Sequence, residues 1–190
     1  MGADFFAAAA VDFARAEKPA SPLLFRYGAG FADVLAALPG LAPYPFVPEV
    51  AAIEWARLCA YHAADAAPLS PEALAAVPPD ALPRLVFAAH PAARLVAAPA
   101  GGYGAWRANA GDAAANGTAA GDDATVGVLV TRPQWQVLMT PLDATAMRLA
   151  AALLDGAALG DAAAAADTGG DRALAPTLAA LLSAGALADP

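Results

Sequence analysis

The segment from residue 110 to residue 125 reads AGDAAANGTAAGDDAT and contains no large apolar side chain. Such a segment cannot bury enough surface to offset the conformational entropy that is lost when a chain becomes ordered. We therefore expect a linker at 110–125. It would leave two parts of the chain, 1–109 and 126–190, to build their own cores.

Alanine dominates the composition and limits what can form those cores. The hydrophobic fraction is 59%, but alanine contributes much of it and each alanine buries little area. The larger Leu, Phe, Trp, Tyr and Val side chains must therefore define the interior.

The charge balance limits the kinds of partner that the protein can bind, and its apolar runs indicate where it is located. Ten Lys and Arg residues stand against eighteen Asp and Glu residues, for a net charge of −8. Nucleic-acid binding draws on basic side chains, so this balance argues against it. No apolar run is long enough for a membrane span, and Asp4 and Asp12 interrupt the position of a signal peptide. We expect a cytoplasmic protein.

The first part of the chain predicts a helical domain. Phe5, Phe6 and Phe13 follow helical spacing within residues 2–17, and a second helical region covers 21–38. The clearest pattern is VPEVAAIEWARLCAYHAAD at 47–65, where apolar residues recur every three or four positions. Ser70 precedes Pro71 and Glu72 as an N-cap, which predicts a short helix ending near Val77.

The second part predicts a hairpin followed by helices. Residues 126–130 and 135–139 have strand composition on either side of a turn at 131–134. Helices are expected at 143–154, 159–166 and 172–182, with Gly156 and Gly185 as C-caps. We therefore expect a mainly α fold with a small β-hairpin, in which 126–190 is a winged-helix-like α+β module.

Catalytic chemistry needs clustered nucleophiles, bases or metal ligands, and the chain has few of them. His62 and Asp65 are close in sequence, and His90 would have to complete a metal site for a metal-dependent enzyme. Cys59 is the only cysteine and has no obvious basic partner in sequence. We interpret the protein as a non-enzyme without a cofactor, and keep the metal-dependent enzyme as a third hypothesis.

The stretch HPAARLVAAPAGGYGAWRAN at 90–109 concentrates residues that require specific neighbours. Trp106 and Asn109 are three apart and share one helix face. A buried indole N–H or carboxamide without a partner costs about 1–3 kcal/mol. These side chains are therefore either hydrogen-bonded within a core or exposed at a binding surface.

Four blocks in order carry a family resemblance: SPLLFRYGAGFADVL at 21–35, IEWARLCAYHAAD at 53–65, HPAARLV at 90–96 and AWRAN at 105–109. Together they resemble the HvfC/BufC family of peptide-modification chaperones, also catalogued as DNA-binding-domain proteins. Relative to that family, we expect that a first helical segment before Met1 is missing. Residues 97–103 also depart from the family pattern.

The resemblance implies a helical domain followed by a small β-plus-helix domain. It further implies two partners, a multinuclear non-haem iron oxidative enzyme and a small cysteine-containing precursor peptide whose modified form serves copper handling. The protein would then be a non-catalytic chaperone that presents the peptide to the enzyme. Nine residues are candidates for partner binding or scaffolding: Tyr27, Glu54, Trp55, His62, Asp65, His90, Trp106, Arg107 and Asn109.

The peptide would add a strand to an exposed edge of the hairpin. The candidate edge residues are Val128, Val130, Trp135 and Val137. The leucines Leu174, Leu178 and Leu181 are either a wall for the peptide or plain core. The alternative is a DNA-binding protein that uses the winged-helix-like module. However, only three arginines face six aspartates in 126–190.

Overall fold

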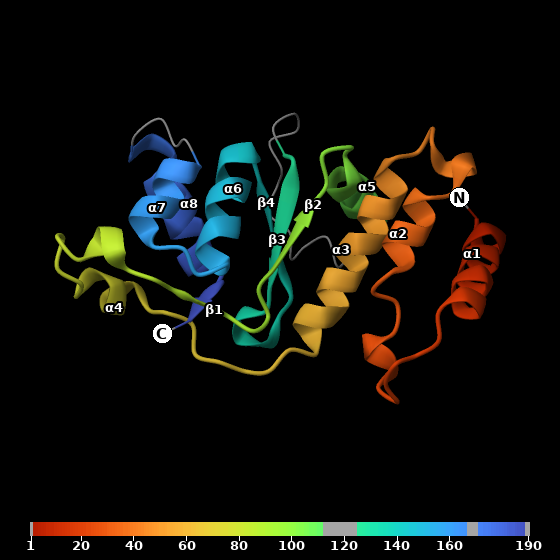
Figure 1. Cartoon of the computed structure of the whole chain (residues 1–190), viewed down its shortest axis with the longest axis horizontal. Coiled ribbons are helices and arrows are strands. Elements are labelled where there is room, and N and C mark those ends of the chain that lie inside the picture. Colours follow the sequence, from red (N-terminus) through yellow and green to blue (C-terminus); the bar gives the residue numbers. More distant parts are fainter. Residues whose placement is uncertain (1, 112–124, 167–170, 189–190) are drawn as a thin grey trace.

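The computed structural model describes residues 2–111, 125–166 and 171–188. The chain is mainly helical with a small antiparallel sheet (Figure 1). The helices are α1 (Ala3–Ala16), α2 (Phe31–Ala36), α3 (Phe46–Tyr61), α4 (Pro71–Ala75), α5 (Gly102–Asn109), α6 (Ala144–Leu154), α7 (Leu159–Ala165) and α8 (Asp171–Ser183). The strands are β1 (Ala88–Ala89), β2 (Arg94–Ala97), β3 (Gly127–Thr131), β4 (Leu138–Leu142) and β5 (Leu187–Ala188).

Local sequence signals placed most helices correctly. The Ser70 side chain accepts a hydrogen bond from the Ala73 N–H and begins α4, and Asp143 caps α6 through the Ala146 N–H. Gly156 follows α6 with a φ of +86° and Gly185 follows α8 with a φ of +65°. Glycine adopts this left-handed conformation without strain, so both C-cap predictions are confirmed.

A three-stranded sheet with the order β2-β3-β4 lies at the centre of the molecule. The predicted hairpin is present as β3 and β4, with Leu129 opposite Thr140. Its second strand was predicted at 135–139, but it begins only at Leu138, because a 3-10 turn at Pro133–Trp135 lengthens the connection. β2 comes from before the predicted linker and pairs antiparallel with β3, so that Val96 lies opposite Val128. The predicted boundary between 109 and 126 therefore does not separate two independent structures. The linker itself falls on residues 112–124, outside the described part of the chain.

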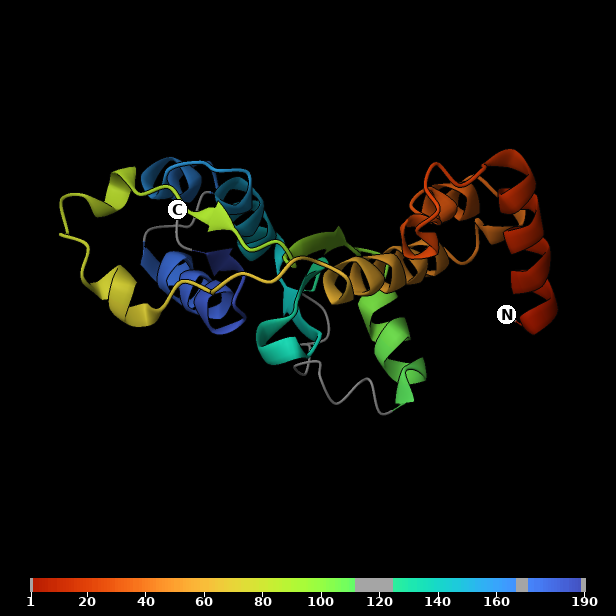
Figure 2. The same ribbon diagram turned by 90° about the horizontal axis from the view of Figure 1, so that it is seen from below.

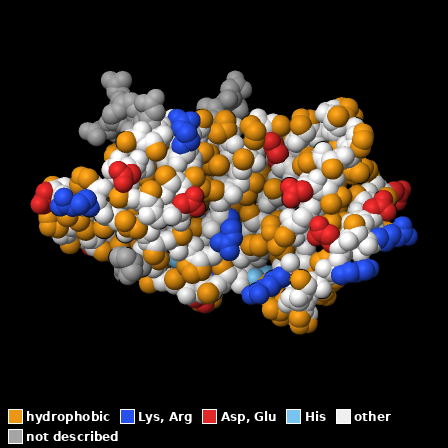
Figure 3. Space-filling model, viewed as in Figure 1, with side chains coloured by type: hydrophobic (Ala, Val, Ile, Leu, Met, Phe, Trp, Pro, Cys, Tyr) orange, Lys and Arg blue, Asp and Glu red, His pale blue; other side chains and the backbone are white. Residues whose placement is uncertain are grey.

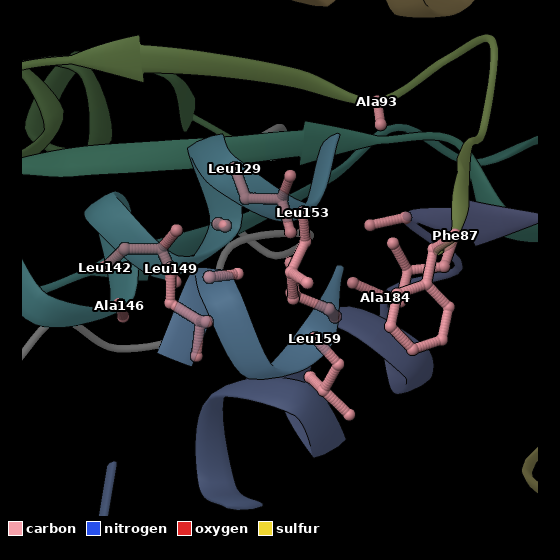
Figure 4. Close-up of a cluster of buried hydrophobic side chains, with 14 of the residues drawn as sticks. Phe87, Ala93, Leu129, Leu142, Ala146, Leu149, Leu153, Leu159 and Ala184 are labelled. Carbon is pink, nitrogen blue, oxygen red and sulfur yellow. The ribbon is translucent and has the colours of Figure 1, made fainter. Parts of the chain in front are cut away.

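The two faces of the sheet pack against different helices. Val128 and Val130 point to one face and join Ile53 of α3 and Trp106 of α5 in one buried cluster. Leu129, between them, points to the other face and packs with α6 and its neighbours, as Figure 4 shows. Because successive strand residues alternate in direction, one strand serves both cores.

A second, smaller pairing also joins distant segments. β1 pairs antiparallel with β5, with Ala88 opposite Ala188, and the His90 N–H donates to the Ala186 carbonyl. The C-terminal strand is thus tied to the segment that leads into β2.

Figure 2 shows α1 and α2 at one end of the molecule and α7 and α8 at the other, with the sheet and α3 between them. Within the described residues, no helix has the length and apolarity that a bilayer span requires.

Replacing Leu129 by Ala should lower the free energy of unfolding by about 2–5 kcal/mol, because the change empties a buried site in the central strand. Urea denaturation followed by circular dichroism measures this loss. Leu24, which is 72% exposed, provides the matched control, and its replacement by Ala should change stability by less than about 0.5 kcal/mol. Equal effects of the two substitutions would contradict the packing described above.

Candidate binding surfaces

An apolar groove of about 660 Å³ lies between α1, α2 and α3. It brings together three of the residues singled out from the sequence, Tyr27, Glu54 and Trp55. Other lining residues come from all three helices and include Phe6, Phe13, Phe31, Leu35, Val50 and Leu58. A groove of this size, lined by aromatic and aliphatic side chains with few polar groups, is typical of binding sites.

The wall of the groove around Tyr27 is fixed by specific contacts. The Tyr27 hydroxyl donates to the Glu17 carbonyl at 2.8 Å, and its ring lies 5.4 Å from the ring of Phe13. Gly28 has a φ of +127°, and a Cβ at this position would touch the Trp55 ring at 3.5 Å. The backbone angle favours glycine here, whereas a Cβ at 3.5 Å would make only an ordinary van der Waals contact with the indole.

Glu54 connects the groove to the interior. The Trp106 Nε1–H donates to Glu54 Oε1 at 2.6 Å, and Arg57 donates to Oε2 at 2.8 Å. The Arg57 guanidinium also lies over the Trp106 ring, 5.0 Å from its centre. Trp106 is buried, so its indole belongs to the hydrogen-bonded core and not to an exposed surface. The sequence left open whether Trp106 is a core residue or an exposed binding residue, and the structure shows that it is a core residue.

The remainder of α5 is held by its neighbours. The Glu49 carboxylate accepts from the N–H groups of Ala100 and Gly102 at 2.9 and 2.8 Å, and so caps the helix from a distance. Asn109 donates from Nδ2 to the Ala105 carbonyl at 2.8 Å. Arg107 Nε is buried, with no acceptor among the described residues. Asn109 and Arg107 lie outside the groove.

The C-terminal end of α3 is closed by Arg132, a residue that the sequence analysis did not select. Its guanidinium donates to the carbonyls of Ala60 and Ala63 and to Asp65 Oδ1, at 2.9, 2.8 and 2.8 Å. A cation at this end of a helix interacts favourably with the unpaired carbonyls. The only signal in the sequence was a single arginine directly after an apolar strand. Its partners are about seventy residues away.

The two histidines and Asp65 are not brought together. His62 stacks on Phe25 at 4.3 Å between ring centres, whereas Asp65 binds Arg132. The Ala92 N–H donates to His90 Nδ1 at 3.1 Å, and His90 Nε2 lies 3.0 Å from the Ala66 carbonyl. Because a carbonyl only accepts, this arrangement assigns the proton to Nε2 and uses both ring nitrogens. Over the described residues, no three potential metal-ligating side chains of His, Cys, Asp or Glu form a group.

Cys59 lies on α3 and is partly buried. Burial raises the pKa of its thiol, and the nearby positive charge of Arg94 opposes this effect in part. A raised pKa lowers the fraction of reactive thiolate at neutral pH.

The edge residues proposed from the sequence divide into two groups. Val128 and Val130 lie in β3, which is paired on both sides, so their assignment to a sheet edge is wrong. Trp135 and Val137 precede β4, which pairs with β3 alone among the described strands. Trp135 is 71% exposed, has a φ of +68° and lies against the Arg132 guanidinium at 5.3 Å.

The three leucines of α8 belong to the core. Leu181 is fully buried, and Leu174 and Leu178 pack against the cluster that contains α6. Of the two roles considered for these leucines, a core role is therefore correct, and they do not form an open wall beside the sheet.

Comparison of the chain with protein-family models, with curated proteins and with solved structures finds no match.

Replacing Trp106 by Phe should lower the free energy of unfolding by about 1–3 kcal/mol, because the ring keeps most of its packing but the donor to Glu54 is lost. The matched control is Trp55→Phe. Trp55 lies in the open groove, so a smaller loss is expected there. Urea denaturation of both variants measures the difference, and an equal or greater loss at Trp55 would contradict the role assigned to the Trp106 indole.

Proposed function

We propose that this protein is a non-catalytic adaptor that binds a multinuclear non-haem iron oxidative enzyme and a cysteine-containing precursor peptide. The proposal rests on the resemblance of four sequence blocks to the HvfC/BufC family. One structural observation carries it further. Two separate surfaces support two partners, the apolar groove of α1, α2 and α3 and the β4 edge with the exposed Trp135.

The groove is the surface we assign to the enzyme. Of the nine candidate residues, Tyr27, Glu54 and Trp55 line it directly. Trp106 supports it from behind through Glu54, and Asn109 and Arg107 lie on the helix that carries Trp106. Large protein partners bury apolar and aromatic anchors in such concave sites.

The β4 edge is the surface we assign to the precursor peptide. An extended peptide can add a strand to an open edge through backbone hydrogen bonds, each worth about 0.5–1.5 kcal/mol. Pro141 in β4 has no N–H, and proline is tolerated at such an edge. It also reduces the number of bonds that a peptide could form, so an apolar anchor must contribute. Trp135 is the exposed aromatic side chain next to this strand.

The alternative, a DNA-binding role for the winged-helix-like module expected at 126–190, gains no support from charge. Arg172 is the single basic residue in α8, and three arginines face six aspartates over 126–190. Figure 3 shows basic side chains scattered over the visible face, without a continuous basic patch. Tight binding to a phosphate backbone requires such a patch.

The adaptor proposal predicts that the protein, the iron enzyme and the precursor peptide co-purify when they are produced together. Replacing Trp135 by Ala should weaken peptide binding at least about tenfold while the enzyme stays bound, because only the anchor beside β4 is lost. Isothermal titration with the synthetic precursor measures the effect. Val86→Ala is the matched control, since Val86 is also an exposed apolar residue, at 46%. Failure of the enzyme and this chain to associate would overturn the proposal.

A further inference from the structure

One face of α3 is only partly covered by the other described residues. The residues of α3 that line the groove are Val47, Val50, Ala51, Glu54, Trp55 and Leu58. Their spacing places them on one stripe of the helix. Because a helix rises 1.5 Å per residue, the stripe from Val47 to Leu58 is about 16 Å long, or three turns.

The opposite wall of the groove is also helical. Phe6, Ala10 and Phe13 of α1 line it at the spacing i, i+4 and i+7. A second cavity, of about 520 Å³, shares Phe6, Phe31, Leu35 and Val47 with the first, so the apolar surface continues between the first residues of α1 and of α3. Phe6 is 62% exposed. Contiguous exposed apolar surface rimmed by polar groups marks interaction sites.

The charge of the groove restricts its occupant. Among the residues that the structure describes, Glu54 is the only charged one that lines it, and its side chain is 52% exposed. Each Glu54 oxygen accepts one bond from within the protein, and a carboxylate oxygen has capacity for a second. No described Lys or Arg lines the groove, although Arg57 pairs with Glu54 Oε2 from beside it at 2.8 Å. The whole chain carries a net charge of −8. The remaining acceptor capacity of Glu54 and the net charge of the chain favour a partner that is apolar with one positive group.

We propose that the groove binds an amphipathic helix of a partner protein, about three turns long, with a Lys or Arg side chain placed against Glu54. This inference deepens the proposed function. It rests on that function for one point, that the partner is the iron enzyme. A second copy of this chain fits poorly, because two copies that each carry −8 repel one another.

Two synthetic fourteen-residue helical peptides test the inference. Both carry leucines at i, i+3, i+7 and i+10, and they differ only in having Lys or Glu at i+4. Fluorescence anisotropy with the full chain should give saturable binding of the Lys peptide. The Glu peptide should bind at least about fivefold more weakly, because opposite charges attract and like charges repel at this contact.

Variants of the protein locate the binding. Leu58→Asp replaces an apolar lining residue by a carboxylate that the leucines of the peptide would desolvate. This cost exceeds the weak attraction of an exposed carboxylate for Lys, so the Lys peptide should bind at least about tenfold more weakly. Val11→Asp is the matched control, because Val11 is 47% exposed on α1 and lines neither cavity, and it should retain wild-type affinity. Glu54→Gln keeps an acceptor for the Trp106 indole and should remove the preference for Lys over Glu. Circular dichroism establishes that each variant is folded.

Three results would overturn the inference: equal binding of the two peptides, wild-type affinity in Leu58→Asp, or a dimer in light scattering that Leu58→Asp dissociates. The last would assign the groove to a second copy. Binding of the Lys peptide without any association with the iron enzyme would leave the groove assignment standing and remove the adaptor proposal. If the enzyme still associates with the Leu58→Asp variant, the adaptor proposal stands and the assignment of the groove to the enzyme is removed.

Discussion

The pairing of β2 with β3 holds the two halves of the chain together, because it joins residues before and after the predicted linker in one sheet. Val96 and Val128 sit opposite one another in this pairing and share a buried cluster with α3 and α5. Without β2, β3 would be an edge of a two-stranded hairpin, which is marginally stable by itself. The cores on both faces of the sheet therefore both depend on this long-range pairing.

The position of α3 explains why the molecule has an open groove. Ile53, Ala56 and Ala60 on one side of the helix are buried, all three in the cluster against the sheet. The stripe on another side meets α1 and α2 but is not filled by them. Arg132 fastens the C-terminal end of α3 to the turn after β3, which carries the exposed Trp135. The two proposed binding surfaces are thus connected through one helix and one buried arginine.

Sequence reasoning succeeded where the signal was local. Ser70 and Asp143 mark helix starts through their own side chains, and Gly156 marks a helix end through its backbone angle. It failed for the pairing of β2 with β3, because the register of such a contact is set by packing between distant segments and leaves no local pattern. The composition of 110–125 then suggested a boundary between domains, and the assignment of Val128 to an edge followed from that error.

The candidate site could likewise be predicted only in part from the sequence. Helical spacing placed Glu54 and Trp55 on one helix, but it could not show that Trp106 would bind Glu54 from fifty residues away. Arg132 carried no motif, since its role depends on the carbonyls at the end of α3.

Native-state hydrogen exchange of the β2 and β3 backbone amides, followed residue by residue by nuclear magnetic resonance, tests the central claim most directly. If the shared sheet holds both cores, the hydrogen-bonded amides of both strands should exchange only through global unfolding, with one common free energy. Exchange of the β2 amides at a much lower free energy than those of β3 would contradict the account. It would show that the two halves of the chain fold as separate units.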